Sequence, residues 1–152
     1  MRTDQQITNT LEHLIVTEFN DYLDKVDFKL DTITANNVSQ EFPDVENGKC
    51  STMIWIVPTY GENEELSFNS NLSSLSINVF ITTKRDKTEN LQKKVFGYLT
   101  ALECLVWHNQ SLNGEAEFME ITSSDFYPAI EGDRNYAGVE VVLRIRYTKI
   151  YE

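Results

Sequence analysis

The last sixteen residues, "AGVEVVLRIRYTKIYE" at positions 137–152, constrain the fold more than any other stretch of the chain. Successive side chains of a β-strand point to opposite faces of the sheet. A strand here places one set of residues on an apolar face (Val139, Val141, Leu143, Ile145 and Tyr147) and another on a polar face (Glu140, Arg144, Arg146 and Thr148). Such a strand needs partner strands and a layer that covers its apolar face. The sequence therefore predicts a sheet with one buried face.

Two helices are predicted to supply the covering layer. The first runs from about Asp4 to Leu23, because Thr3 and Gln6 fit a capping box and apolar residues recur at helical spacing after them. The second begins with Asp86 as its N-cap and has Glu89 three residues later. Its apolar stripe consists of Leu91, Val95, Leu99, Leu102 and Val106.

Four segments are typical of strands. Residues 51–59 are apolar on both faces and are expected to end at Pro58, whereas residues 60–71 form a long polar connection. Alternation resumes over 72–84, which predicts the hairpin partner of 51–59. Residues 116–129 and the closing strand form a second predicted hairpin.

The order of elements predicts an α+β fold in a single domain spanning residues 1–152. We expect a mainly antiparallel four- to five-stranded sheet with two helices packed on one face, the fifth strand being a small one within 28–38. A chain of this length buries enough surface to fold without disulfides or metals. Cys50 and Cys104 are therefore interpreted as two reduced thiols.

The charge of the chain is strongly acidic and unevenly placed. Its formal net charge is −11, which disfavours tight binding to nucleic acid. Residues 84–94 nevertheless carry five cations against two anions, and residues 115–133 carry six anions and no cation. Two interpretations remain open: two solvated surfaces, or patches of opposite sign that meet in a head-to-tail contact between copies.

No recognisable catalytic or metal site emerges. His13 and His108 lack the partners of a zinc site, and Glu62, Glu64 and Glu65 lack the spacing of a calcium loop. Nucleophile-elbow, dinucleotide, phosphate-loop and zinc-protease motifs are absent from the sequence. Five aromatic residues are interpreted as core: Trp55, Phe80, Tyr98, Trp107 and Phe118. We expect no enzyme activity, no cofactor and no metal.

The layout resembles the tail-terminator and head-to-tail joining proteins of long-tailed bacteriophages and prophages. The likeness rests on the order of the elements, the segment "TTKRDKTENLQKK" and the ending "FYPAIEGDRNYAGVEVVLRIRYTKIYE", and it spans most of the chain. The long polar stretch at 24–49 departs from it. The resemblance implies a structural subunit that forms a ring, commonly a hexamer, which caps the tail tube and has no catalytic residues.

The same resemblance implies the partners and the location. The partners would be other copies of the chain, the tail tube protein and the head connector proteins, with no membrane; the location would be the host cytoplasm during assembly and then the virion tail. Proposed contacts are Lys84, Arg85, Lys87, Lys93, Lys94, Glu115, Glu117, Glu120, Arg144, Arg146, Ile150 and Tyr151. Glu62, Glu64 and Glu65 are candidates to line the lumen of the ring, or else belong to a mobile loop without a specific role.

Two other functions remain open. One is a monomeric or dimeric acidic binding protein, which inhibits a basic enzyme or mimics nucleic acid. The other, less well supported, is a small enzyme whose site is assembled from scattered acids.

Overall fold

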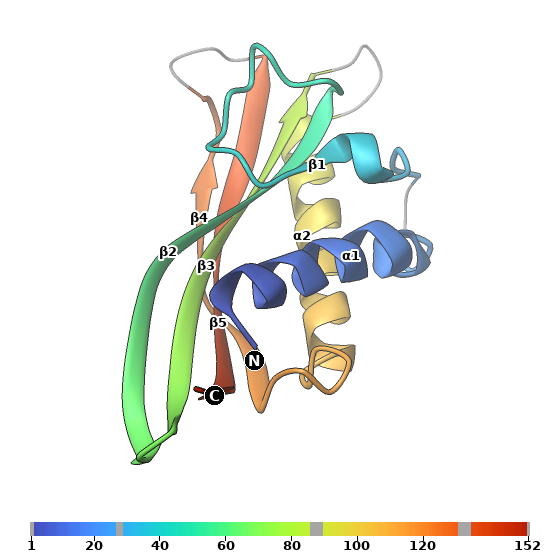
Figure 1. Cartoon of the computed structure of the whole chain (residues 1–152). Coiled ribbons are helices and arrows are strands. Elements are labelled where there is room, and N and C mark those ends of the chain that lie inside the picture. Colours follow the sequence, from blue (N-terminus) through green and yellow to red (C-terminus); the bar gives the residue numbers. More distant parts are fainter. Residues whose placement is uncertain (1, 27–28, 86–89, 131–134, 152) are drawn as a thin grey trace.

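The computed structural model describes residues 2–26, 29–85, 90–130 and 135–151. In chain order the elements are α1 (Asp4–Leu23), the 3-10 helix η1 (Ala35–Asn37), β1 (Val38–Ser39), β2 (Thr52–Ser67), β3 (Ser70–Lys84), α2 (Leu91–His108), β4 (Phe118–Tyr127) and β5 (Tyr136–Ile150). The α+β fold expected from the sequence is confirmed (Figure 1).

The five strands form one mixed sheet in the order β1-β2-β3-β5-β4. β1 pairs with β2 in parallel, and the other three pairs are antiparallel, whereas the sequence predicted a mainly antiparallel sheet. The small strand expected within 28–38 is reduced to β1. The residues just before it form η1, whose Asn37 side chain donates to the carbonyl of Thr52 at 2.9 Å.

Helix α1 has the bounds and the cap that the sequence predicted. The Thr3 hydroxyl accepts a hydrogen bond from the Gln6 amide at 3.2 Å, and the Gln6 side chain accepts one from the Thr3 amide at 3.1 Å. Two backbone donors at the start of the helix are thereby satisfied.

Helix α2 begins later than predicted. Asn90 has an extended backbone and is the N-cap, because its side chain accepts a hydrogen bond from the Gln92 amide at 3.0 Å. The predicted cap, Asp86, and its partner Glu89 lie outside the described residues, as does Lys87. The predicted stripe is correct, since Leu91, Val95, Leu99, Leu102 and Val106 are all buried.

The largest correction concerns residues 58–71. Pro58 does not end the strand, and the polar stretch after it is not a loop: β2 continues to Ser67 and pairs with β3 in one long hairpin. Proline fits because β1 pairs only with Ile54 and Trp55, so at Pro58 β2 is already an edge strand among the described residues.

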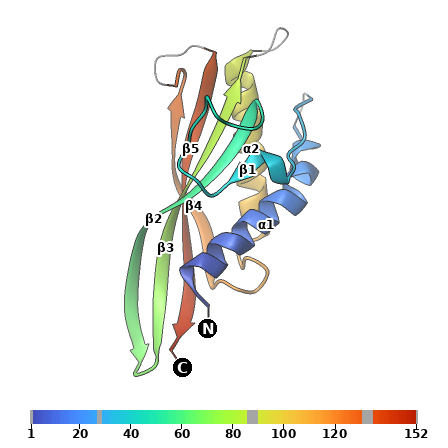
Figure 2. The ribbon, with the colours of Figure 1, turned by 45° about the horizontal axis from the view of Figure 1, so that its top comes forward.

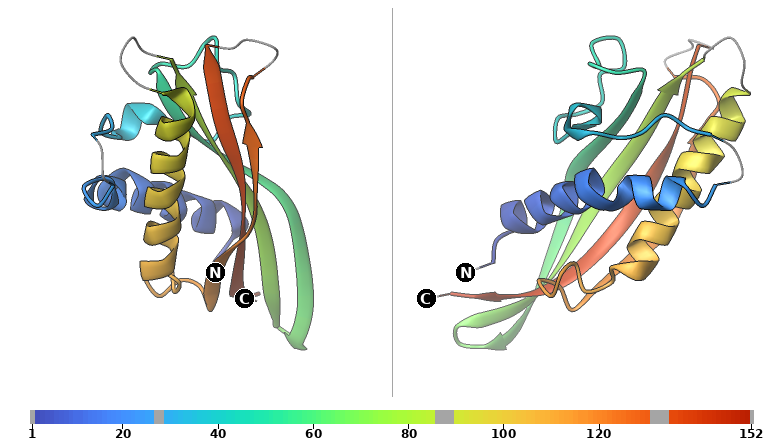
Figure 3. Two further views of the ribbon diagram at one scale, coloured as in Figure 1. Left: turned by 180° about the vertical axis from the view of Figure 1, so that it is seen from behind. Right: turned by 90° about the vertical axis from the view of Figure 1, so that its right-hand side faces the viewer.

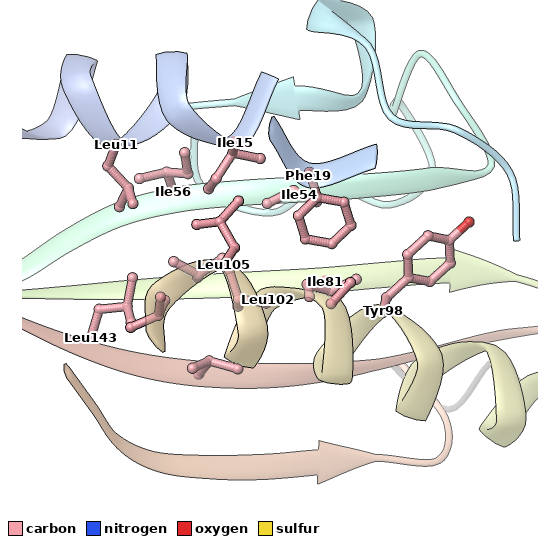
Figure 4. Packing of buried hydrophobic residues seen from close by; sticks show 14 of the residues in the cluster. Leu11, Ile15, Phe19, Ile54, Ile56, Ile81, Tyr98, Leu102, Leu105 and Leu143 are labelled. Carbon is pink, nitrogen blue, oxygen red and sulfur yellow. The ribbon is translucent and has the colours of Figure 1, made fainter. Parts of the chain in front are cut away.

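A continuous hydrophobic core lies between the helices and the sheet. Both helices lie on the same side of the sheet (Figure 3), and Leu14 of α1, Leu99 of α2, Val79 and Leu143 all belong to one buried cluster. Figure 4 shows the side chains of the two helices converging with those of β2, β3 and β5. Fully buried Tyr98 keeps its hydroxyl satisfied by donating to the Asp31 carbonyl at 3.2 Å.

Among the described residues, the opposite face of the sheet is covered near the start of β2 and the adjoining end of β3. Met53 and Trp55 are buried there, and the Trp55 indole donates to the hydroxyl of Thr82, which is also buried. Below we call this side of the sheet, away from the helices, the outer face.

Two of the five aromatic residues interpreted as core are exposed. Trp107 is 72% exposed and Phe118 37% exposed, whereas Trp55 and Tyr98 are buried and Phe80 is half-buried. Cys50 and Cys104 are free thiols, each partly exposed. Among the described residues, neither helix combines the length and hydropathy that crossing a bilayer requires.

Candidate interaction surface

The β2–β3 hairpin projects beyond the rest of the molecule. Its lower half extends past both helices in every view, and Figure 2 shows it separated from the helical layer. All ten residues from Pro58 to Ser67 are exposed. From Pro58 onward β2 therefore contributes little to the core.

The outer face of this hairpin combines acids and bases that the sequence analysis assigned to different sites. Through the register of the strands, Glu62 lies opposite Ser74 of β3, and Ser74 lies opposite Arg146 of β5. Glu62, Glu64, Arg144 and Arg146 line one shallow groove of about 330 Å³. These residues form a mixed-charge surface in place of a purely acidic loop.

Glu65 departs from the other two glutamates. It lies opposite Asn71, one position along from Glu64, and therefore on the other face of the hairpin. Tyr60, on the outer face, donates its hydroxyl to Glu62 at 2.8 Å, and this hydrogen bond to a carboxylate raises the pKa of Tyr60. The three acids thus do not form one cluster facing a single channel.

The tip of the hairpin carries exposed apolar side chains. Phe68 in the turn is 96% exposed and Leu66 is 54% exposed. The end of β5 lies beside them, because the Tyr151 amide donates to the Asn69 carbonyl at 2.7 Å and Ile150 is paired with Ser70. Ile150 and Tyr151, predicted as apolar contacts, are 49% and 46% exposed. Leu66, Phe68, Ile150 and Tyr151 are called the tip cluster below.

An apolar groove lies at the opposite end of the sheet. It has a volume of about 290 Å³. It lies on the outer face and is lined by Phe42, Pro43, Val45, Phe80, Thr82, Tyr127, Ala129, Ile130, Gly138 and Val139. Phe42 is 76% exposed at its rim, 6.4 Å from Phe80 between ring centroids. Gly138 at the floor allows β5 to approach β3 closely, because a Cβ there would lie 2.6 Å from the Ile81 carbonyl oxygen.

The basic segment predicted as a contact lies at the same end as this groove. Lys84 and Arg85 are exposed at the end of β3, and Lys93 is exposed on α2. Lys94 differs, since its side chain is buried and its amine donates to the Lys84 carbonyl at 3.2 Å. We therefore exclude Lys94 from the accessible surface.

The acidic segment is partly engaged within the same chain. Glu115 accepts a hydrogen bond from Thr10 at 2.6 Å, Glu117 accepts one from Thr148 at 3.1 Å, and Glu120 lies directly opposite Arg144. Its last three residues, 131–133, lie outside the described residues. These intrachain partners make 115–133 a weaker acidic patch than its composition indicated.

One polar network connects the start of α1 to the end of β5. Asp4 accepts a hydrogen bond from the hydroxyl of Tyr147 and forms an ion pair with Lys149 at 3.1 Å. Burial, followed by the hydrogen bond to Asp4, raises the pKa of Tyr147. This network fixes the end of β5 and hence the position of the tip cluster.

The described residues hold no group of three or more metal-ligating side chains. The described residues present an exposed apolar tip at one end of the sheet and an apolar groove at the other. Sequence reasoning missed Leu66, Phe68 and the groove. The available signal was the presence of two apolar residues within the polar stretch "YGENEELSFNSN".

Comparisons with known proteins identify no family. No protein-family model matches the chain, and no curated protein matches it. A chain from a solved structure, described as the virion of a native gene transfer agent particle, is similar over 76% of this chain and 81% of that one, with 8% identity and a TM-score of 0.49. A likeness this distant assigns no function.

Proposed function

We propose that this chain is a structural virion-assembly protein: a tail-terminator or head-to-tail joining subunit that forms a ring, of six copies by the resemblance described above, on the end of a tail tube. The observation that carries the proposal is the projecting hairpin, which exposes an apolar tip well away from the core. Exposed apolar clusters of this kind mark interaction sites in soluble proteins.

Assembly from identical copies requires two different, complementary surfaces on each copy, so that one end of a molecule contacts the other end of the next. The chain has two such ends. One end presents the tip cluster and the glutamates of the hairpin, and the other presents the apolar groove with Lys84 and Arg85 beside it.

The edge of the sheet formed by β2 beyond its pairing with β1 is a poor alternative contact. β2 carries Pro58, two register irregularities and three glutamates along this edge. Each of these features discourages another strand from pairing there. Contacts through side chains at the two ends are therefore favoured over extension of the sheet at its β2 edge.

The competing function is an acidic inhibitor or nucleic-acid mimic, which the net charge of −11 favours. The mixed-charge surface argues against it, because Arg144 and Arg146 line the same groove as Glu62 and Glu64. A mimic of nucleic acid requires a continuous negative surface that attracts basic partners.

Light scattering over a concentration series, followed by mixing with tail tubes of the virus or prophage that encodes the chain, tests the proposal. We expect association of the protein with itself and additional density at the ends of the tubes. A protein that stays monomeric at high concentration and never decorates a tube end would contradict the proposal and favour the inhibitor.

A further inference from the structure

We infer that the contact between copies is made by the tip cluster of one copy seated in the apolar groove of a second copy, with Phe68 as the inserted side chain. This inference rests on the proposed assembly of identical copies and names its interface. It rests on the position, exposure and chemistry of the two surfaces.

The tip cannot fill the groove of its own chain. Ser70 begins β3 beside the tip, whereas Thr82 near the end of the same strand lines the groove. A strand rises about 3.3 Å per residue, so roughly 40 Å separates the two sites. Figures 1 and 2 show the hairpin tip and the far end of the sheet at opposite ends of the molecule. Only another molecule can bring them together.

The two surfaces match in size and polarity. A volume of about 290 Å³ is at the small end for ligand pockets and accommodates an aromatic side chain. Phe42, Phe80 and Tyr127 provide aromatic partners for an inserted phenylalanine ring. At 96% exposure, Phe68 has nearly its whole side chain available for burial.

Strands β2 and β3 carry opposite charges at their two ends, on surfaces that are otherwise mixed in charge. Residues 52–83 contain no lysine or arginine and include Glu62, Glu64 and Glu65. Lys84 is exposed two residues beyond Thr82 on the same strand, and Arg85 follows it. Acids are present at this end as well: Glu41 and Asp44 flank the groove and Glu140 accepts a hydrogen bond from Tyr127 at 2.8 Å. The opposite charges are thus Glu62, Glu64 and Glu65 of β2 and Lys84 and Arg85 at the end of β3, while Arg144 and Arg146 of β5 lie beside Glu62 and Glu64.

A contact of this kind is heterologous, because it joins different surfaces of the two molecules. Successive contacts close into a ring when the rotation between copies permits it, and otherwise extend into a filament. The tip and the groove occur once on every copy, so each copy can both give and receive the contact.

Photo-crosslinking tests the inference directly. Benzoylphenylalanine replaces Phe68 in an isotopically labelled copy of the full chain, which is mixed with an unlabelled copy, irradiated and digested for mass spectrometry. We expect crosslinks between labelled and unlabelled peptides at 42–45 and 127–130. Crosslinks confined to other surfaces, or none between copies at the highest concentration, would overturn the inference.

Substitutions measure how much the contact contributes. Phe68→Ala is expected to weaken self-association by about 10- to 100-fold, the range that corresponds to losing the burial of one phenylalanine. Ala129→Glu is expected to weaken it as well, by filling the groove and placing a charge in its apolar lining. Trp107→Ala is the matched control, because this 72% exposed aromatic lies on α2 outside the groove. Its association should be unchanged.

The outcomes separate this inference from the proposed function. If Phe68→Ala and Trp107→Ala associate equally well and still decorate tube ends, the tip-to-groove contact is wrong and the function stands. If the wild-type protein self-associates through the tip but never binds a tube end, the contact stands and the terminator function is wrong.

Discussion

Leu143 provides a quantitative test of which face of the sheet is buried. Its side chain is fully buried, lies opposite Ile77 of β3 and Ile121 of β4, and belongs to the cluster between sheet and helices (Figure 4). Replacing a fully buried leucine by alanine removes apolar contacts and leaves a cavity. We expect Leu143→Ala to lower the free energy of unfolding by about 2–5 kcal/mol.

The neighbouring residue supplies the control. Val142 precedes Leu143 on β5 but points to the outer face and is only half-buried. Val142→Ala removes two methyl groups from a partly solvated site and should cost about 1 kcal/mol or less. Both variants keep the backbone and the charge of the strand.

Urea denaturation followed by circular dichroism measures both changes, at a protein concentration low enough to exclude self-association. A domain of this kind has a total stability of about 5–15 kcal/mol, so Leu143→Ala should shift the midpoint markedly without changing the slope. Equal losses for the two variants would refute the assignment of a buried and an outer face to β5.

Other predictions concern the start of α1. Tyr147→Phe should destabilise the protein by about 1 kcal/mol at neutral pH, because the hydrogen bond to Asp4 is lost. Because the pKa of Tyr147 is raised, the folded state holds the phenolic proton more tightly than the unfolded chain does. The free energy of unfolding should therefore fall as pH rises above 10.0, by up to about 1.4 kcal/mol per pH unit. Denaturation curves that fall as steeply for Tyr147→Phe as for the wild type would contradict this cause. Thr3→Ala should lower the free energy of unfolding by about 1 kcal/mol, because the capping box is lost. Thr17 has an exposed hydroxyl within the helix, so Thr17→Ala should lower it by about 0.5 kcal/mol or less. Equal losses of stability in thermal melts would exclude the cap as the reason.

The parts of the fold that sequence reasoning predicted well are those with one buried and one solvated side. The bounds of α1 follow from the Thr3 cap and from apolar residues at helical spacing. The alternation of β5 likewise places Leu143 and its neighbours in the core. In both cases local pattern and tertiary packing agree.

The exposed part of β2 beyond Pro58, up to Ser67, was not predicted as a strand because its residues are mostly polar on both faces. Periodicity reveals a strand only when one face is buried, and from Pro58 to Ser67 neither face is. Trp107 was wrongly interpreted as core, because it lies one turn from Glu103 on the solvent side of α2. A tryptophan is typical of a core position, but the position of Trp107 on the helix places its side chain in solvent.

The candidate surface depended on contacts that are distant in the sequence. Glu62 and Arg146 come together only through the order β2-β3-β5, and Phe42 meets Phe80 only because the segment after β1 covers the outer face. The residue types were visible in the sequence, but the register that joins them was not.

The most direct test of the proposed assembly role is electron microscopy of tail tubes incubated with the gold-labelled full chain. The label is attached at an exposed site away from the two contact surfaces, such as the cysteine of Trp107→Cys, after both native cysteines are removed by Cys50→Ser and Cys104→Ser. The proposed function predicts a ring of label at one end of each tube and none along its length. Unlabelled tube ends, with the protein remaining free in solution as a monomer, would contradict it.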